Sequence, residues 1–302
     1  MSVVPRWKEL RDIIRLMRPH QWPKNILVFV PIILAHQLTD ETKLLSGLLA
    51  FVAMSLASSA AYIVNDLLDI RSDLHHPAKK LRPLASGSLS KGEGLSCAFV
   101  CLAGSVAISL FSLPLIFLGF VVGYLVLALG YSVAFKKLIV ADVMVLSALY
   151  GLRILAGGAA TEIVVSPWLL AFSAFLFLSL AFVKRFAELK IRASIGAKGL
   201  PGRGYRASDL ALIQMSGLSS ALMSVVVFFI YIAGSDIVKG YYPQPLFLWL
   251  IGPILIYWLT RIWFLAERGV VDDDPVDFAL RDMTSWILGI TAMLLVLLAS
   301  SG

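Results

Sequence analysis

Long apolar stretches, separated by short basic segments, constrain the fold of this chain more than any other feature. Of its 302 residues, 59% are hydrophobic and 15% are charged, and the mean hydropathy is +0.86. A water-soluble protein does not need so much apolar surface, so the expected solvent is a lipid bilayer. The sequence therefore predicts an all-α, polytopic integral membrane protein.

About nine of these stretches have the length of roughly 20 residues that a helix needs to cross a bilayer. They lie at residues 23–40, 44–65, 94–112, 114–134, 138–160, 166–187, 209–234, 244–266 and 281–300. Pro23 and Pro31 make the first stretch irregular, and Pro114 separates the third from the fourth. No convincing repeat or low-complexity tract interrupts the chain, so we expect residues 1–302 to form a single transmembrane domain.

Lys and Arg gather on one side of the predicted spans. All but three of the 26 basic residues lie before the first span, at its start, or in alternate connections; the three are Lys43, Lys239 and Arg153. By the positive-inside rule, the N-terminus and the basic loops then face the cytoplasm from the inner (plasma) membrane. The formal net charge of +7 also suits anionic headgroups or substrates.

The first 20 residues lack the apolar core and the small-residue cleavage site of a signal peptide, so no cleavable signal is expected. Their apolar residues recur at helical spacing among basic ones, and these are Trp7, Leu10, Ile14 and Met17. This pattern is typical of an amphipathic helix that lies on the inner membrane surface.

A group of amide and carboxylate side chains follows the second span. In a helix, Asn65, Asp69 and Asp73 recur every four residues and share one side. Asp66, three residues before Asp69, lies on the same side. Carboxylates at a membrane are costly and usually face a polar cavity. Clustered oxygen ligands suit Mg²⁺, which often sits between one or two carboxylates and substrate phosphates. The motif favours a cation site, and a solvated helix end is the alternative.

The loop after this motif is basic and contains Arg82-Pro83. A diphosphate bound through Mg²⁺ needs carboxylates for the metal and cations for its outer oxygens. Arg82, close to the acidic helix end, is a candidate for the second role. Ordinary positive-inside charge is the alternative interpretation of this loop.

Arg153 lies well inside the fifth span, in the segment Tyr150-Gly151-Leu152-Arg153. A buried guanidinium is costly unless it is paired, so we expect it to face a polar chamber and to contact an acid or a phosphate. Asp142, on about the same face of the same helix, is a candidate partner of Arg153 or could line the same chamber. Tyr150 is counted with Arg153 among the candidate substrate-binding residues.

Three further polar segments lie near predicted span ends. The sixth span ends with Lys184, Arg185 and Glu188, whose helical spacing allows a salt bridge or a binding role. The first span begins with Arg18-Pro19-His20-Gln21-Trp22-Pro23-Lys24-Asn25, which puts two cations at the membrane surface. Asp274-Pro275 is more typical of a helix N-cap with proline at the first helical position than of a metal site.

These residues resemble the UbiA superfamily of intramembrane prenyltransferases. The pattern Asn65-Asp66-x-x-Asp69-x-x-x-Asp73, followed by Arg82-Pro83, is similar to the first acidic motif of that family and its basic loop. The nine-span layout extends the resemblance over nearly the whole chain. In typical members, Mg²⁺ on two acidic motifs binds a prenyl diphosphate, and the isoprenoid cation attacks an aromatic acceptor. This chain departs from the pattern, because Lys184-Arg185-x-x-Glu188 stands where the second acidic motif is expected.

That departure, with the segment from Arg18 to Asn25, resembles the branch of decaprenyl-phosphate phosphoribosyltransferases. Members of this branch hold the diphosphate of phosphoribosyl pyrophosphate through the same acidic motif, and their acceptor is a lipid phosphate. The donor carries an additional phosphate and the acceptor is itself an anion, which favours cations over a second acidic cluster. The resemblance therefore implies a Mg²⁺-dependent polyprenyl-phosphate phosphoribosyltransferase, an activity of cell wall biosynthesis.

The resemblance also implies a role for each candidate residue. The metal would be bound by Asp66 and Asp69, with Asn65 and Asp73 beside them, and the catalytic set would be Asp66, Asp69 and Asp73. The donor phosphates would be bound by Arg82, Lys184, Arg185 and Arg153. The lipid phosphate would be bound by Lys24 and Arg18. Glu188 would orient a cation or the ribose hydroxyls.

Two other function classes stay open at this point. An aromatic prenyltransferase of the same fold would use a polyprenyl diphosphate donor, and the missing second acidic motif argues against it. A membrane transporter is disfavoured, because the chain lacks an inverted repeat and its polar motifs gather on one side. The expected partners are phosphoribosyl pyrophosphate, polyprenyl phosphate and the lipid bilayer, with no nucleic acid, and a homo-oligomer is left open.

Overall fold

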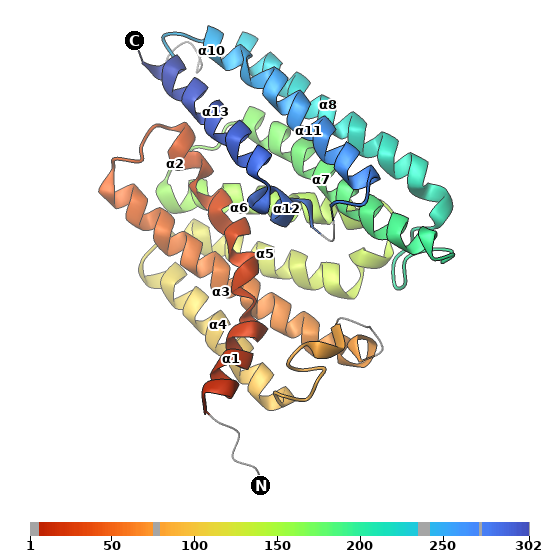
Figure 1. Cartoon of the computed structure of the whole chain (residues 1–302). Coiled ribbons are helices and arrows are strands. Elements are labelled where there is room, and N and C mark those ends of the chain that lie inside the picture. Colours follow the sequence, from red (N-terminus) through yellow and green to blue (C-terminus); the bar gives the residue numbers. More distant parts are fainter. Residues whose placement is uncertain (1–5, 75–78, 235–241, 272–273, 302) are drawn as a thin grey trace. The chain divides into compact units, whose positions relative to one another are not determined.

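The computed structural model describes residues 6–74, 79–234, 242–271 and 274–301. These residues form α-helices and short 3₁₀-helices, with an isolated β-bridge between Gly199 and Arg206. The elements, most of them labelled in Figure 1, are α1 (Arg6–Met17), η1 (Pro19–Phe29), α2 (Val30–Leu34), α3 (Glu41–Asp73), η2 (Lys79–Leu81), α4 (Lys91–Phe111), α5 (Leu115–Val133), η3 (Phe135–Lys137), α6 (Ala141–Thr161), α7 (Pro167–Ser194), η4 (Ala207–Asp209), α8 (Leu210–Gly234), α10 (Leu246–Trp249), α11 (Ile251–Glu267), α12 (Pro275–Arg281) and α13 (Met283–Ser300). The predicted all-α architecture is confirmed.

Within the described residues, 8 helices are long and apolar enough to cross a membrane. They are Glu41–Arg71, Lys91–Phe111, Leu115–Val133, Ala141–Thr161, Pro167–Ser194, Ala207–Gly234, Leu246–Glu267 and Met283–Ser300. Each coincides with one of the predicted spans from 44–65 onward. A transmembrane helix satisfies its own backbone hydrogen bonds, so a sufficiently long apolar run forms one with little help from its neighbours.

The predicted first span, 23–40, has a different structure. It comprises part of the 3₁₀-helix η1 and the short helix α2, and the chain turns at His36, whose φ is 54°. Pro23 lies inside η1 and Pro31 lies in the first turn of α2, and proline cannot donate the hydrogen bond that a continuous α-helix requires. A 3₁₀-helix rises about 2.0 Å per residue, so η1 and α2 together still extend about 30 Å, the thickness of the hydrocarbon core.

The chain divides into two compact units. The first contains Met1–Val133 and Leu152–Val165, and the second contains Ala134–Gly151 and Ser166–Gly302, so each unit includes part of α6. In the first unit, α3 packs along α4 and also contacts α1, η1 and α5 (Figure 1). In the second, α7 packs along α8, and α11 contacts α7, α8 and α13. The single domain expected over residues 1–302 stays a prediction.

The described side chains of α1, from Leu10 onward, pack on the first unit through one side of the helix. Leu16 is buried in a cluster with residues of α3 and α4, and Met17 packs against the same cluster. Leu10 and Ile14 are exposed, as is Arg11 beside them. Exposed apolar and basic residues on one helix suit a membrane surface. The side chain of Trp7, also predicted for this stripe, lies outside the part of the chain that is described.

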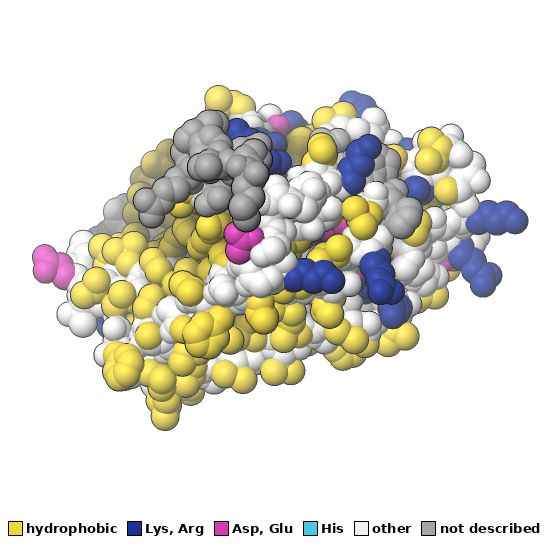
Figure 2. Space-filling model, turned by 90° about the horizontal axis from the view of Figure 1, so that it is seen from below, with side chains coloured by type: hydrophobic (Ala, Val, Ile, Leu, Met, Phe, Trp, Pro, Cys, Tyr) yellow, Lys and Arg dark blue, Asp and Glu magenta, His cyan; other side chains and the backbone are white. Residues whose placement is uncertain are grey.

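Large apolar side chains are exposed on many of the membrane-spanning helices. Phe99 and Phe111 of α4 and Leu115 of α5 are examples. Figure 2 shows hydrophobic side chains gathered over much of the face in view. Such an extensive exposed apolar surface is unusual for a soluble protein and is expected where helices contact lipid.

Candidate active site

The acidic motif lies at the C-terminal end of α3. Asp66 and Asp73 are buried, and Asn65 and Asp69 are half-buried. Helical spacing sets these residues on one side of α3, as predicted. The polar character of this side continues toward the N-terminus of the helix through Tyr62.

Two arginines contact the buried carboxylates. Arg82 follows η2 and donates from Nη1 to Asp66 Oδ1 at 3.0 Å and to Asp73 Oδ2 at 2.7 Å. Arg18 donates from Nη2 to Asp66 Oδ1 at 2.6 Å, and its guanidinium lies 5.2 Å from the ring centroid of Tyr62. The structure thus brings Arg82 to the acidic motif, as its place in the sequence suggested. The contact of Arg18 with this motif was not predicted.

The oxygen atoms on this part of α3 fit a magnesium ion that arrives with a diphosphate. Among the residues whose structure is described, no three His, Cys, Asp or Glu side chains converge closely enough to form a metal site by themselves. Mg²⁺ does not require such a site, because it keeps several waters and is often held by one or two carboxylates together with substrate phosphates. Asp66, Asp69 and Asp73 supply carboxylates of this kind, and the neighbouring Arg18 and Arg82 suit phosphate oxygens.

The 3₁₀-helix η1 is attached to α3 by polar contacts. Trp22 Nε1 donates to Ser59 Oγ at 3.0 Å. One turn further on, Asn25 Nδ2 donates to Ser55 Oγ at 3.0 Å and to Ser58 Oγ at 3.3 Å. The small serine side chains let the backbones approach, and their hydroxyls supply hydrogen bonds within the apolar span. These contacts place η1 alongside the helix that carries the acidic motif.

Arg153 of α6 is buried in the same unit. Its Nε donates to Asn25 Oδ1 at 2.8 Å, and its Nη2 donates to Tyr124 OH at 3.1 Å. Its guanidinium also lies 4.9 Å from the ring centroid of Tyr124. The polar surroundings predicted for Arg153 are therefore present. Nearby on η1, Lys24 is also buried and donates to Gln21 Oε1 at 2.6 Å.

In the second unit, Arg185 of α7 is fully buried between two carboxylates. Its Nε lies 2.5 Å from Asp142 Oδ2, and its Nη1 pairs with Glu188. Arg203 approaches the same two acids, with Nη1 3.3 Å from Asp142 Oδ1 and Nε 3.7 Å from Glu188 Oε2. Two guanidiniums and two carboxylates therefore form a cluster without net charge, which we call the α7 cluster.

Asp142 has different neighbours from those expected. The sequence offered it as a partner for Arg153, but the structure places Arg185 and Arg203 against it. Eleven residues along one α-helix correspond to about 16 Å, which is too far for a direct contact. Asp142 and Arg153 share a face of α6 without being neighbours on it.

Lys184 pairs with an acid from a distant part of the chain. Its Nζ lies 3.3 Å from Asp274 Oδ2. Asp274 is the N-cap of α12, with Pro275 following it, and its Oδ1 accepts the backbone N–H of Val276 at 3.0 Å. The N-cap predicted from Asp274-Pro275 is confirmed. The acidic residues 272 and 273 lie outside the described part of the chain.

Tyr150, the remaining candidate, packs within the second unit. Its ring stacks on Phe177 of α7, with centroids 4.6 Å apart and an interplanar angle of 13°. The ring therefore has a packing role that the sequence did not reveal. Its predicted contact with a substrate stays a prediction.

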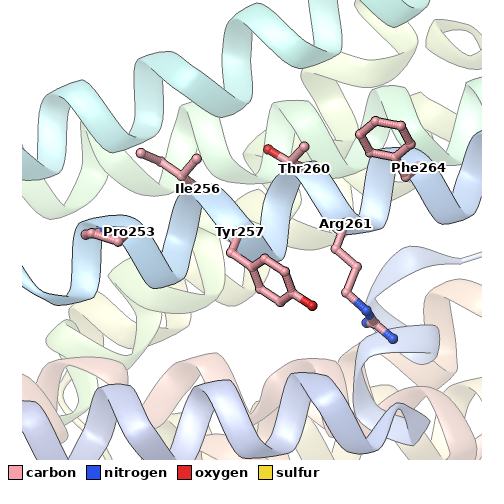
Figure 3. Close-up of a pocket in the computed structure, with 6 residues that line it drawn as sticks. All are labelled: Pro253, Ile256, Tyr257, Thr260, Arg261 and Phe264. Atoms are coloured by element: carbon pink, nitrogen blue, oxygen red, sulfur yellow. The ribbon is translucent and has the colours of Figure 1, made fainter.

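A groove of about 590 Å³ runs along α11. It is lined by Pro253, Ile256, Tyr257, Thr260, Arg261 and Phe264 (Figure 3). In the view of Figure 3, Tyr257 and Arg261 point to the same side. Arg261 donates to Asp282 at 2.6 and 3.0 Å, and these hydrogen bonds lower the pKa of Asp282 to about 2. The charge of Arg261 is thus balanced, and the largely apolar groove suits lipid better than a diphosphate.

Comparison with known proteins identifies the family. The model of the UbiA prenyltransferase family matches residues 26–283. The chain belongs to this family. It is therefore a membrane enzyme of the UbiA kind, as the acidic motif and the basic loop indicated.

Similar sequences occur in several bacteria. Nodulation protein NoeC of Azorhizobium caulinodans is 36% identical over 290 residues, which cover 93% of this chain and 91% of that protein. The uncharacterized protein y4nM of Sinorhizobium fredii is 37% identical over 280 residues, which cover 93% of this chain but only 54% of that protein. Decaprenyl-phosphate phosphoribosyltransferase of Corynebacterium glutamicum is 36% identical over 195 residues, which cover 63% of this chain and 59% of that enzyme. The chain thus spans about half the length of y4nM.

The fold of a solved UbiA protein agrees with this assignment. A UbiA homologue from Archaeoglobus fulgidus, bound to GPP and Mg²⁺, superposes with a TM-score of 0.68. The match covers 95% of this chain and 98% of that one, at 18% sequence identity. At this identity the likeness shows the fold alone.

Proposed function

We propose that this UbiA enzyme is a Mg²⁺-dependent polyprenyl-phosphate phosphoribosyltransferase. It would transfer the 5-phosphoribosyl group of phosphoribosyl pyrophosphate to a polyprenyl phosphate and release diphosphate. The observation that carries the proposal is the α7 cluster, in which the buried Arg185 stands where the family pattern has an acidic motif. A donor with an additional phosphate and an anionic acceptor favours a cation at this position. The partial identity with the corynebacterial phosphoribosyltransferase supports the same donor.

The reaction joins the lipid phosphate to C1 of ribose. An oxygen of the lipid phosphate forms the new bond to C1, while the bond from C1 to the diphosphate breaks and its electron pair leaves with the diphosphate. The attacking phosphate is already an anion at neutral pH, so no general base is needed. The chain would act by positioning both substrates and by stabilising the charge that develops on the leaving group.

The first unit would supply groups that bind the leaving diphosphate. Asp66 and Asp69 would hold Mg²⁺, with Asn65 and Asp73 beside them, and the bound ion would neutralise charge on the diphosphate. Arg82 and Arg18, which contact Asp66, would donate to the diphosphate oxygens. The contact of Arg18 with Asp66 supports a role at the donor in place of the lipid-phosphate role that the sequence suggested.

Other candidates keep the roles that the resemblance implies. Lys24, buried on η1, would bind the lipid phosphate. The donor phosphates would be bound by Arg153, Lys184 and Arg185. Glu188 would orient Arg185, with which it pairs. All of these groups would act from the cytoplasmic side, where the positive-inside rule puts the basic loops.

Product analysis tests this function directly. Purified protein in nanodiscs, given Mg²⁺, phosphoribosyl pyrophosphate and polyprenyl phosphate, should form a phosphoribosylated lipid that mass spectrometry detects, together with diphosphate. A parallel reaction should contain a polyprenyl diphosphate and an aromatic acid, because the solved UbiA homologue binds GPP and Mg²⁺. Product in the second reaction only would replace the proposal with an aromatic prenyltransferase.

A further inference from the structure

The segment between α7 and α8 folds into a hairpin, defined as residues 198–207. Leu200 N–H donates to the carbonyl oxygen of Tyr205 at 3.1 Å, and Ala207 N–H donates to that of Lys198 at 3.0 Å. These paired hydrogen bonds give the short segment a defined shape. The hairpin therefore presents its side chains in fixed directions.

Two contacts hold the hairpin against the turn that precedes α6. The hydroxyl of Tyr205 accepts the backbone N–H of Val140 at 3.1 Å, and the Tyr205 side chain is buried. Burial raises the pKa of this tyrosine, so its hydroxyl stays neutral. At Gly204, a Cβ atom would lie 2.7 Å from Ile139 Cγ1 and 2.9 Å from the carbonyl oxygen of Lys137. The close approach requires glycine at this position.

The docked hairpin brings Arg203 to the α7 cluster. Gly204 and Tyr205, the two residues that hold the hairpin in place, follow Arg203 directly in the chain. Arg203 in turn contacts both acids that surround Arg185, namely Asp142 and Glu188. The hairpin thus delivers a second guanidinium to a site where the first is already enclosed by carboxylates.

The charge balance explains what Arg203 contributes. With Arg203 present, two positive charges face two negative ones in the α7 cluster. Without it, the two carboxylates would outnumber the one remaining guanidinium, and the cluster would carry a net negative charge. The neighbouring Lys184 also acts on Glu188, but its charge is already balanced by Asp274. A net negative charge in a poorly solvated site repels an approaching anion. Arg203 therefore decides whether Arg185 can attract one.

We infer that Arg203 is a positioning residue that keeps Arg185 available to bind the diphosphate of the donor substrate. The inference rests on the proposed function in that it takes the α7 cluster as part of donor binding. The inference goes beyond the proposed function by assigning a role to the hairpin between α7 and α8.

Direct binding of inorganic pyrophosphate with Mg²⁺ tests this role. Calorimetry on the full-length protein in detergent should show that Arg203→Ala raises the Kd for pyrophosphate about tenfold or more, because it leaves two carboxylates facing a single cation. Arg203→Lys should recover most of the affinity, since it restores the charge without the planar fork. Lys198→Ala removes a charge from an exposed position of the same hairpin and should leave the Kd within about twofold of wild type, as expected of an exposed charge in high dielectric.

Steady-state kinetics separate this role from a purely structural one. Arg203→Ala should raise the KM of the diphosphate donor while the KM of the lipid acceptor changes little. Unchanged pyrophosphate affinity in Arg203→Ala, or equal losses in the alanine and lysine variants, would overturn the inference and leave the proposed function standing. A wild-type protein that binds pyrophosphate but makes no phosphoribosylated lipid would overturn the proposed function and leave the role of Arg203 standing. Wild-type protein that binds no pyrophosphate would overturn both.

Discussion

Arg18 and Asp66 are separated by 48 residues in the sequence, yet Arg18 Nη2 lies 2.6 Å from Asp66 Oδ1. The same oxygen accepts a hydrogen bond from Arg82 at 3.0 Å. Asp66 thus pairs with two cations of the first unit. Arg18 precedes α3 in the sequence, and Arg82 follows it. Variants of Asp66 change both arginine contacts and the proposed metal site together.

Replacing Asp66 tests the metal site. Asp66→Asn keeps the size of the side chain but removes the negative charge that Mg²⁺ needs. Turnover at saturating substrate should fall by about two orders of magnitude or more, since metal-assisted charge stabilisation supplies several kcal/mol. Asp69→Asn should act in the same direction. Glu41→Gln, an exposed acid at the other end of α3, is the matched control and should keep normal turnover. Near-normal activity of Asp66→Asn at ordinary Mg²⁺ would remove the metal assignment.

Arg82 is expected to contribute to donor binding. Arg82→Gln loses charge-assisted hydrogen bonds worth about 1.5–3 kcal/mol each, and 1.4 kcal/mol corresponds to one decade. The KM for phosphoribosyl pyrophosphate should therefore rise about tenfold or more. Lys80→Gln removes a charge from an exposed position in the same loop and should have little effect. If both variants changed the KM equally, general positive charge would account for the effect and Arg82 would have no specific role.

Arg185 should be tested with a substitution that keeps its charge. Alanine would leave Asp142 and Glu188 without their buried partner, which typically costs about 3–5 kcal/mol of stability. Arg185→Lys preserves the charge and loses the planar fork, so the KM of the donor should rise about tenfold while the KM of the lipid phosphate moves less. Arg192→Lys, on the same helix, serves as the control. Unaltered donor kinetics in Arg185→Lys would contradict a binding role for the guanidinium.

The contact between Arg153 and Asn25 should contribute to stability. Asn25→Leu removes the acceptor of the Arg153 Nε–H and also leaves Ser55 and Ser58 without a hydrogen-bond donor. The free energy of unfolding should fall by about 1–3 kcal/mol, measured by thermal melting in detergent. A double-mutant cycle with Arg153→Met should give a coupling energy of about 0.5–2 kcal/mol, in the range of buried polar pairs in membranes. Additive effects of the two changes would show that the contact contributes no stability.

The distribution of the basic residues predicts the orientation of the chain in the membrane. Single cysteines at Ser86 and Thr39, introduced into a background without Cys97 and Cys101, should react with a membrane-impermeant reagent from opposite sides of sealed vesicles. Both positions are exposed, and α3 lies between them in the chain. Ser86 should be accessible from the cytoplasmic side, because it follows the basic loop. Labelling of both residues from one side would contradict the span assigned to α3.

The membrane-spanning helices could be predicted from the sequence because they depend on local properties. A run of about 20 apolar residues forms a helix in lipid whatever surrounds it. The N-cap at Asp274 is local in the same sense, since it needs only an acid followed by a proline. The segment 23–40 was less predictable. Its prolines showed that an α-helix would be interrupted, but the 3₁₀ conformation of η1 also reflects its polar contacts with α3.

The sequence alone reveals which residues are costly to bury and which side of a helix they occupy. It indicated the acidic side of α3, the buried Arg153 and the cations at the end of α7, because charge and helical periodicity are sequence properties. Arg203 was considered only as one of the basic residues of its loop. The adjacent Gly204, which packs closely against Ile139, is the one sequence feature that could have indicated a close approach of this loop.

Which of these charges meet depends on how the helices pack in three dimensions. Arg18 pairs with Asp66, Arg185 and Arg203 share Asp142, and Lys184 contacts Asp274. Periodicity defines the face of a helix on which a side chain lies, but the identity of its partner depends on how separate helices pack. These partners are distant in the sequence, so no local pattern could reveal them.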